Sequence, residues 1–369
     1  MNSKKTTTEQ EMREMLTDGC VLLQPLVIRC IRLDQTVDAG RTLDALIEVA
    51  WGKQSARFAV EMKALFTPKA FEDAVNQLKA ATLPAGTLPM VLMPYLGESQ
   101  LNELKRVKIS GIDLCGNGVV IVPDRLFVFR MGARNRFTSS APIKNIYRKN
   151  SSMVPRVFLA RPSFEKVSEV LVEINTRNLL VSAFNRTAMG MGTVSKAIKV
   201  LEEDLIVSRE KGPIRLIQPD KLLAKLLENY VPGKPGITRV RVSLALSELP
   251  GRLADLSKEL NLPIVATGLG SVNRYAVMQR GETLSVYCPR PEALLARLPA
   301  SESDRFPNLE IFATEDESTC FDSRPDEKTG FRWAAPVQTY LELMRGDKRD
   351  QETAEQVRVD LIRQAVGAA

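Results

Sequence analysis

The sequence predicts a multidomain protein of mixed α/β and α+β architecture, and three observations support this prediction. The chain has 369 residues with 44% hydrophobic content, more than one ordinary core needs, so two or three domains are expected. Strand-like and helix-like patterns alternate up to about residue 130. Two linker-like stretches follow, TSSAPIKNIYRKNSSMVP after Phe137 and VPGKPG after Tyr230.

These patterns give a first division of the chain. Strands are expected near residues 25–33, 43–51, 56–63 and 89–93, with helices near 67–81 and 98–107. The domains are expected at residues 1–137, 153–232 and 237–369, with a linker at 138–152.

The composition excludes several classes of chemistry. There is no histidine, so Ser-His-Asp triads and histidine-based acid-base catalysis are ruled out. The five cysteines are scattered without a CxxC pair, which argues against a disulfide framework or a cysteine zinc site. No apolar run is long enough to span a membrane, and the N-terminus has no secretory pattern, so a cytoplasmic protein without a membrane partner is expected.

The charge is unevenly distributed along the chain. The formal net charge is +7, and basic residues exceed acids up to about residue 235, whereas acids exceed bases beyond it. A basic front portion suits a polyanion such as DNA. An excess this small is also typical of an ordinary solvated surface.

Residues 41–63 have the pattern of a hairpin. Apolar residues alternate on both strands, and a two-residue turn at Gly52-Lys53 would pair each position i with 105 minus i. In that register Asp44 lies across from Glu61, and Lys63 shares their face. Two carboxylates about 5 Å apart could hold one Mg²⁺. The metal would polarise a phosphodiester, and the lysine would position water.

On pattern alone, a solvated hairpin face is the favoured interpretation of Asp44, Glu61 and Lys63. The ExK pattern is common by chance, and a second example occurs at Glu103-Leu104-Lys105. The pattern CGNG after Asp113 is first interpreted as a turn, because Asn-Gly pairs favour turns.

Residues 40–137 nevertheless resemble the PD-(D/E)xK, restriction-endonuclease-like fold. The resemblance rests on the acid of the second strand, on ExK at the end of the third, on a following helix with Gln77, and on GIDLCGNG at 111–118. It implies that Asp44 and Glu61 are metal ligands, Lys63 the catalytic lysine and Gln77 a helper. A further acid would come from Glu9, Glu11 or Glu14.

Residues 163–216 have the order helix, helix, hairpin. One helix is expected over 163–174 with Ser163 as its N-cap, and a second buries Val194, Ala197, Ile198 and Leu201. The second helix leaves Thr193, Ser195, Lys196 and Lys199 on its other side, and Arg209 and Lys211 stand at the hairpin tip. This is the order of a winged helix, whose second helix enters the major groove of DNA. The alternative is a helical spacer with a solvated face.

The segment MGTVSKAIKVLEEDLIVSREKG resembles bacterial winged-helix regulators, and residues 237–369 resemble the C-terminal domain of AbiEi-type antitoxins of type IV toxin-antitoxin systems. The latter rests on ATGLGSVNRYAV, LSVYCP and APVQTYLELMRGDKRDQETAEQVR. It implies promoter repression and a nucleotidyltransferase-like toxin as partner. Gly270-Ser271 is similar to a nucleotidyltransferase turn, but no DxD follows, so nucleotidyl transfer is not expected.

Two apolar stripes near the end of the sequence are expected to be core. One is Val337, Tyr340, Leu341 and Met344, and the other is Ala354, Val357, Leu361 and Ile362. Residues 314–328 hold six acids and are expected to be an exposed, mobile loop.

Together these features predict a DNA-binding transcriptional regulator of antitoxin type with a nuclease-like N-terminal domain. The alternative is an active Mg²⁺-dependent DNA endonuclease that its winged helix directs to DNA. The enzymatic question stays open from sequence, as does a third interpretation, in which the N-terminal domain is a structural or partner-binding relic. Double-stranded DNA is the expected partner, and a homodimer would suit a palindromic operator.

Overall fold

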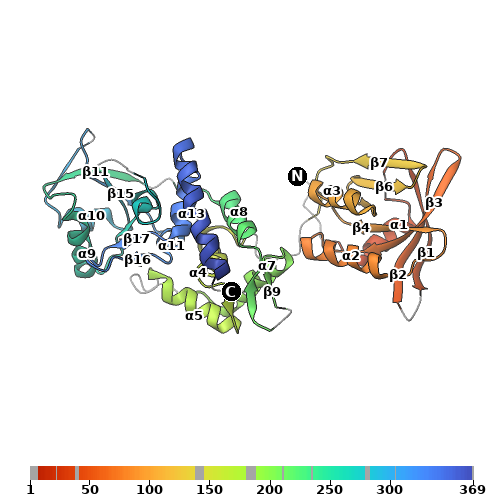
Figure 1. The fold of residues 1–369 in the computed structure, drawn as a ribbon, viewed down its shortest axis with the longest axis horizontal. Coiled ribbons are helices and arrows are strands. Elements are labelled where there is room, and N and C mark those ends of the chain that lie inside the picture. Colours follow the sequence, from red (N-terminus) through yellow and green to blue (C-terminus); the bar gives the residue numbers. More distant parts are fainter. Residues whose placement is uncertain are drawn as a thin grey trace. The chain divides into compact units, whose positions relative to one another are not determined.

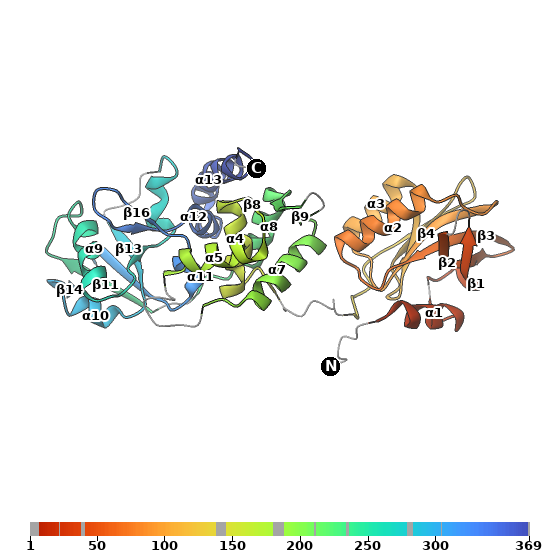
Figure 2. The ribbon, with the colours of Figure 1, turned by 90° about the horizontal axis from the view of Figure 1, so that it is seen from below.

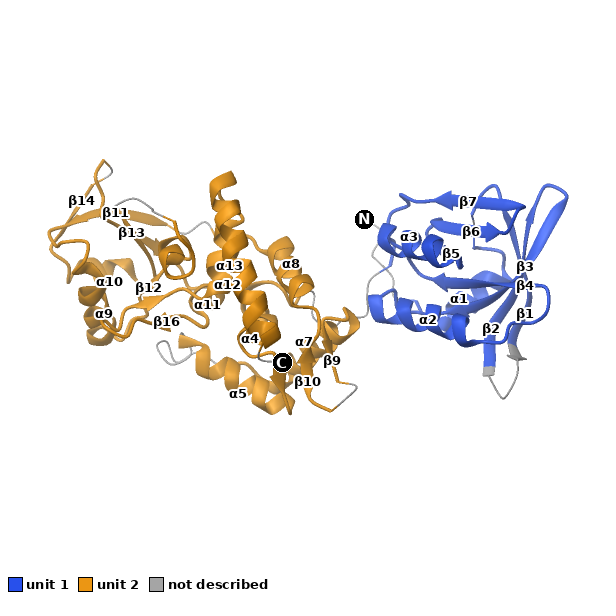
Figure 3. Cartoon of the chain, viewed as in Figure 1, with its two compact units in different colours: residues 1–142 blue, residues 143–369 orange. Residues whose placement is uncertain are grey.

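The computed structural model describes residues 7–21, 23–37, 41–137, 145–179, 188–209, 212–233, 236–278, 283–303 and 305–367. The chain divides into two compact units, Met1–Pro142 and Ile143–Ala369, shown in different colours in Figure 3. We call them the N-terminal unit and the C-terminal unit. Both combine helices with a mixed sheet, which confirms the expected mixed α/β, multidomain architecture.

The N-terminal unit is built on one seven-stranded sheet whose strands follow each other in chain order. The outer neighbours pair antiparallel, whereas β3–β4 and β4–β5 are parallel and are connected through helices. The strands are β1 Val27–Val37, β2 Arg41–Trp51, β3 Gln54–Met62, β4 Thr87–Met93, β5 Ser110–Asp113, β6 Gly118–Val122 and β7 Leu126–Arg130. The predicted strands and helices of this segment are all present.

Helices cover both faces of this sheet (Figure 2). Helix α1 (Glu9–Thr17) packs Met12 and Leu16 on one face, whereas α2 (Pro68–Ala80) and α3 (Glu98–Val107) pack on the other. Helix α2 begins with Thr67 as N-cap and a proline in its first turn, a favourable start for a helix. The two-sided cover explains why β4 is apolar along most of its length.

The β2–β3 hairpin has the predicted register. Glu48 pairs with Arg57, Trp51 pairs with Gln54, and Gly52 in the turn has φ +58°, a conformation that glycine adopts at little cost. Every recorded pair between the two strands obeys the rule predicted from the sequence. The alternating apolar residues are buried as expected, namely Ala45, Ile47, Val49, Phe58, Val60 and Met62.

The C-terminal unit begins with a helical segment, residues 145–229, that carries a three-stranded sheet in the order β8-β10-β9. Its second long helix and the following hairpin occur where they were predicted. The elements are α4 Met153–Ala160, β8 Ser163–Phe164, α5 Val167–Arg177, α7 Met191–Glu203, β9 Val207–Ser208, β10 Ile214–Leu216 and α8 Pro219–Asn229.

Two expectations for this segment are corrected. Ser163 is not a helix N-cap, because it lies in β8 and pairs with Arg215, so α5 starts later, after Lys166. The expectation that residues 138–152 form a linker is also corrected in part. Residues 145–152 pack onto the helical segment, where Ile146 and Tyr147 are buried and Lys149–Ser152 forms a 3-10 helix before α4.

The rest of the C-terminal unit contains a second seven-stranded sheet, in the order β14-β11-β15-β13-β12-β17-β16. Helices α9 (Leu249–Glu259) and α10 (Pro291–Leu295) cover one face. The 3-10 helix η3 (Leu269–Arg274) and α11 (Glu317–Cys320) lie along other parts of the sheet. The strands are β11 Ile237–Val242, β12 Val265–Ala266, β13 Leu284–Cys288, β14 Ala300–Glu302, β15 Leu309–Ala313, β16 Arg324–Pro325 and β17 Arg332–Trp333.

The last two helices pack against the helical segment rather than into the core of this sheet. Helices α12 (Pro336–Leu343) and α13 (Lys348–Gly367) bury their predicted stripes in the same hydrophobic cluster as α4, α5, α7 and α8. Helix α13 contacts α4 and α8 (Figure 1). The stripes are therefore core, as predicted, although of the helical segment.

None of the helices in the described residues combines the length and apolar character that a membrane crossing requires.

Candidate functional site

The predicted carboxylate site lies where β2 separates from β3. The backbone ladder between the two strands ends at the pair Ala45–Val60. Beyond this pair, the Asp44 side chain accepts a 2.7 Å hydrogen bond from the Met62 backbone N–H. Glu61 is buried there, and its carboxylate accepts a 2.7 Å hydrogen bond from Lys63 Nζ. Local geometry thus brings Asp44, Glu61 and Lys63 to one end of the hairpin.

Glu61 opens onto a hollow of about 470 Å³ on the side of α2. Its lining includes Gln77, the helper residue predicted from the resemblance, together with Asp73 and Asn76 of the same helix. Sequence reasoning missed these two residues. Their signal is the spacing 73, 76 and 77, which places three polar side chains on one helix face.

The face alternation expected to hold all three predicted residues together breaks at Asp44. Leu43 packs with α2 and Ala45 packs with α1, although residues two apart in a strand normally share a face. Asp44 contacts α1 through a 3.2 Å ion pair with Arg13. The same guanidinium binds Asp34 at 3.0 Å, and its Nε is buried without a hydrogen-bond partner in the described structure.

The charges around Glu61 include one acid of α1. Burial raises the pKa of the Glu61 carboxyl, the hydrogen bond from Lys63 lowers it, and the negative charges of Asp44 and Glu9 raise it further. Of the three acids of α1 named from the resemblance, Glu9 has the charge that acts on Glu61, as the smallest of these effects. By contrast, Glu11 closes the capping box with Thr8, and Glu14 accepts a hydrogen bond from Gln10.

The side chains at this end of the hairpin offer at most a small set of oxygen ligands for a cation. Within the described ranges, no three acidic or cysteine side chains gather closely enough to hold a metal ion by themselves. Mg²⁺ does not require this, because it keeps several waters and binds through one or two carboxylates plus substrate phosphate. Asp44 and Glu61 are the two carboxylates that the sequence predicted for such a site. Glu61 lines the hollow beside α2, whereas the oxygens of Asp44 are bound by Arg13 and by the Met62 N–H.

Asp113 forms a turn, as predicted, and is fully engaged there. Its Oδ1 accepts the backbone N–H groups of residues 115–117, and its Oδ2 accepts Leu96 N–H and Asn117 Nδ2. Asn117 in turn binds the backbone of Ala133 in both directions. These bonds fix the β5–β6 connection and leave this aspartate no part in the carboxylate site.

The predicted DNA-contacting residues divide into three groups. The helix α7 residues Thr193, Ser195, Lys196 and Lys199 are all exposed, while the opposite side of the helix is buried. Arg209 is also exposed, but it forms a 2.9 Å ion pair with Glu202 of α7. Lys211 lies outside the described residues. Arg215, which sequence reasoning missed, is exposed between two buried residues of β10.

The acidic stretch 314–328 is not an exposed, mobile loop, and that expectation is corrected. It contains α11 and β16, and Glu317, Ser318 and Cys320 are buried. Its acids bind partners within the unit, so that Glu317 accepts Asn178 Nδ2 at 2.6 Å and Asp322 pairs with Arg177. Part of this stretch is therefore fixed by pairing within the C-terminal unit.

The Gly270-Ser271 turn is structural. Ser271 is fully buried, its hydroxyl donates to the Thr267 carbonyl, and its Oγ accepts the Ala334 N–H. A Cβ at Gly270 would stand 2.8 Å from the Ser285 carbonyl oxygen, so the close approach explains the glycine.

In comparisons with family models, curated proteins and solved structures, nothing matches this chain.

Proposed function

We propose that this chain is a DNA-binding transcriptional regulator of antitoxin type with a nuclease-like N-terminal unit. The observation that carries the proposal is the two-sided character of α7. Its inner side is completely buried, whereas Thr193, Ser195, Lys196 and Lys199 are exposed on a helix that follows α5 and precedes a hairpin. This order supports a winged helix whose second helix enters the major groove.

The chemistry of the exposed side suits duplex DNA. Lys196 and Lys199 are three residues apart and present two ammonium groups on neighbouring turns. Ammonium groups bind phosphates and release counterions, whereas hydroxyls such as those of Thr193 and Ser195 can contact phosphates or base edges. Arg209 adds a guanidinium beside the same helix, through its contact with Glu202.

The test is binding of the chain to its own promoter. The double variant Lys196→Ala, Lys199→Ala is expected to bind more weakly, and the slope of log affinity against log salt should fall by roughly one unit per lost phosphate contact. Lys258→Ala, an exposed lysine on α9, is the matched control and should bind like the parent. Unchanged affinity in the double variant would remove α7 as the reading helix.

The antitoxin assignment predicts a second partner. An adjacent gene encoding a nucleotidyltransferase-like toxin should yield a protein that copurifies with this chain and whose toxicity this chain suppresses. A homodimer is proposed for operator binding, since palindromic sites match two-fold proteins. Sedimentation of the protein with and without operator DNA measures that stoichiometry.

An active DNA endonuclease is the second candidate function, and the β2–β3 register is the observation that favours it. The register places Asp44 and Glu61 at one end of the hairpin, with Lys63 bonded to Glu61 and Gln77 lining the same hollow. These are the oxygen ligands, the cation and the helper that hydrolysis of a phosphodiester requires.

Asp44 and Glu61 would hold Mg²⁺, which supplies polarisation of the scissile phosphate and a more acidic water. Side chains of this chain would supply the remaining parts of the chemistry. Lys63 would leave Glu61 to stabilise charge on the phosphate or to orient the attacking water. Gln77, exposed on α2, would orient water or phosphate through its amide. Glu9 would add negative charge that favours the cation.

Plasmid nicking tests this second candidate. The parent should nick supercoiled DNA with Mg²⁺ and not in EDTA, and Lys63→Ala should abolish the nicking. The matched control is Lys105→Ala, which removes the lysine of the second ExK sequence, on α3. Equal nicking by parent and Lys63→Ala would assign the activity to a contaminant, and the N-terminal unit would then be a structural or partner-binding relic.

A further inference from the structure

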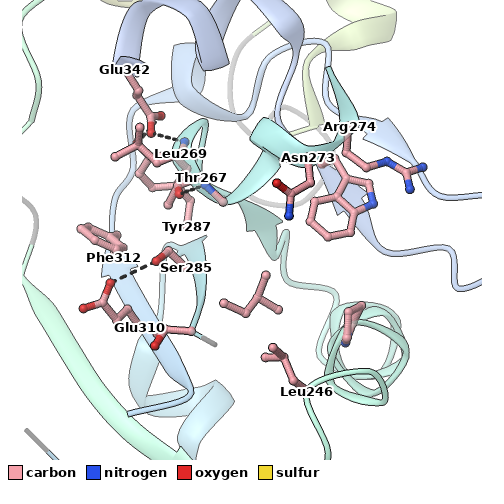
Figure 4. A pocket seen from close by; sticks show the side chains of 15 residues that line it. Leu246, Thr267, Leu269, Asn273, Arg274, Ser285, Tyr287, Glu310, Phe312 and Glu342 are labelled. Atoms are coloured by element: carbon pink, nitrogen blue, oxygen red, sulfur yellow. Dashed lines mark hydrogen bonds between the residues drawn. The ribbon is translucent and has the colours of Figure 1, made fainter. Parts of the chain in front are cut away.

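A pocket of about 470 Å³ opens on the sheet of the C-terminal unit, beside η3 (Figure 4). Along strands β13 and β15, successive side chains point to opposite faces of the sheet. One set of their side chains joins the core under α9 and α10, and the other set, which includes Tyr287, Glu310 and Phe312, lines the pocket. In Figure 4, Ser285 and Glu310 lie on one side, and Asn273 and Arg274 lie on the other. Its volume is within the usual range for small-molecule sites.

A second hollow of about 520 Å³ shares four lining residues with this pocket, namely Leu269, Tyr287, Phe312 and Glu342. We call the place where these four residues lie the junction. Tyr287 and Phe312 line both hollows, whereas Trp333 lines the first and Tyr230 the second. A ligand at the junction would therefore meet aromatic side chains together with the Glu342 carboxylate.

The charges around the junction favour a cation. Glu342 is half-buried and accepts hydrogen bonds from Leu269 N–H, Tyr287 Oη and Gln338 Nε2 at 2.8–3.0 Å. It has no ion-pair partner among the residues that the structure describes. The buried Arg156 acts on it electrostatically and is linked to it through Gln338. Two carboxylate oxygens offer about four acceptor positions, so one remains for a ligand.

Acids outnumber cations around the two hollows. Arg274 pairs with Asp326 at 2.8 Å and lies over the Trp333 ring, whereas Arg345 donates to the neutral carbonyls of Leu227 and Tyr230 and keeps its positive charge. The acids that line the hollows are Glu310, Glu315, Asp316 and Glu342. An organic cation would meet carboxylates and aromatic faces, the combination that recognises ammonium and guanidinium groups.

The junction is connected to the helical segment by hydrogen bonds. Gln338 of α12 donates to Glu342 Oε1 at 2.9 Å and accepts a hydrogen bond from Arg156 Nη1 at 2.9 Å. Arg156 belongs to α4, is fully buried, and its Nε has no partner in the described structure. Helix α4 packs against both α5 and α7. A ligand that binds Glu342 therefore contacts a hydrogen-bonded chain, through Gln338 and Arg156, that ends on α4 in the core beneath α7.

We propose that this pocket binds an organic cation, an ammonium or guanidinium group held by Glu342 and the surrounding aromatic rings, and that its occupancy changes DNA binding through Gln338 and Arg156. The effect on DNA binding rests on the proposed DNA-binding function, whereas the binding of an organic cation does not. The cation could come from a free polyamine or from an arginine side chain of a polypeptide, and these share one chemistry.

The first experiment measures binding by isothermal calorimetry with agmatine, spermidine and the capped tripeptide Gly-Arg-Gly, in the absence of DNA. Binding of either free amine supports a small-molecule source, and binding of the tripeptide alone supports a polypeptide source. Inorganic phosphate serves as the anionic control. Binding of none of the three cations, or tighter binding of phosphate, overturns the proposal.

Variants locate the binding. Glu342→Gln should weaken the best probe at least about tenfold, and Glu292→Gln, an exposed glutamate on α10, should leave it unchanged. Thermal unfolding confirms that each variant is folded. If Glu342→Gln does not fold, Phe312→Leu replaces it and should weaken binding about threefold, since it removes one aromatic face. Full affinity in the folded variant overturns the assignment of the pocket.

The second experiment titrates promoter DNA with and without a saturating concentration of the best probe, at constant ionic strength. A change in DNA affinity of about threefold or more, which disappears in Glu342→Gln, supports the coupling. An identical affinity overturns the coupling and leaves the binding site standing. Absence of any DNA binding contradicts the proposed function, and the calorimetry still decides the pocket.

Discussion

Arg13 of α1 and Asp44 of β2 form an ion pair of 3.2 Å, and Asp44 is the carboxylate that we propose as a metal ligand. The guanidinium therefore competes with any cation for the same oxygen, Oδ1, while Oδ2 holds the Met62 N–H. Because Arg13 is also bound to Asp34, it is held beside the site by a second acid.

Replacing this arginine should tighten metal binding. In Arg13→Gln, the dissociation constant for Mn²⁺ should fall roughly three- to tenfold, because an ion pair between partly buried side chains, here 23% and 20% exposed, is worth on the order of 1 kcal/mol. Electron paramagnetic resonance of free Mn²⁺ measures it directly. Arg32→Gln, on the exposed part of β1, is the control and should bind like the parent. Weaker binding in Arg13→Gln would show that the arginine supports the site.

Glu61 should make stability depend on pH in a defined direction. Its pKa is raised, chiefly by burial, so the folded state holds the proton more tightly than the unfolded state. The free energy of unfolding should therefore fall as pH rises from the ordinary glutamate pKa through the raised one, and stay level above it. Urea unfolding between pH 4 and 8 should show this fall in the parent and a smaller one in Glu61→Gln. An equal fall in both proteins would assign the dependence to other groups.

Glu202 restrains the guanidinium of Arg209, so its removal should favour DNA. Glu202→Gln breaks the 2.9 Å pair and deletes one negative charge near the proposed interface. The affinity for promoter DNA should rise, and the salt slope should steepen by up to about one unit, because a freed guanidinium can reach a phosphate. Glu165→Gln removes the same charge elsewhere in the helical segment and should have a smaller effect. Equal effects would mean that only net charge matters.

Helix α13 offers a matched pair of substitutions that tests its packing. Leu361 is 3% exposed and belongs to the core shared with α4, whereas Val359 is 42% exposed. Leu361→Ala should lower the free energy of unfolding by about 2–4 kcal/mol. Val359→Ala should change it by less than about 0.5 kcal/mol. Chemical denaturation monitored by circular dichroism measures both, and similar values would place α13 off the core.

The features that local pattern determines could be predicted from the sequence. The β2–β3 register follows from alternation and a two-residue turn, so the amino-acid pattern alone places Asp44, Glu61 and Lys63 at one end of the hairpin. The break of the alternation at Asp44 could not be predicted from this pattern. Buried stripes are recognisable on α7, α12 and α13 because they repeat with the helical period.

Contacts between distant segments could not be predicted in the same way. Nothing local connects Arg13 with Asp44, or Glu317 with Asn178, because each pair forms only when separate elements pack. A stripe likewise shows that a helix is buried but not against what, so the sequence does not reveal that α12 and α13 pack on the helical segment. Ser163 was misplaced because a serine before an apolar run resembles a helix N-cap, whereas Phe164 is drawn into the core beside Phe158.

The core of the helical segment joins residues near position 155 to residues near position 360. During synthesis on the ribosome, α4 and α7 emerge long before α13 can cover them, since domains fold once their contacting parts are present. The core beneath α7 is therefore complete only after α13 has been synthesised, and a chain that stops before α13 would lack part of the packing that holds this helix.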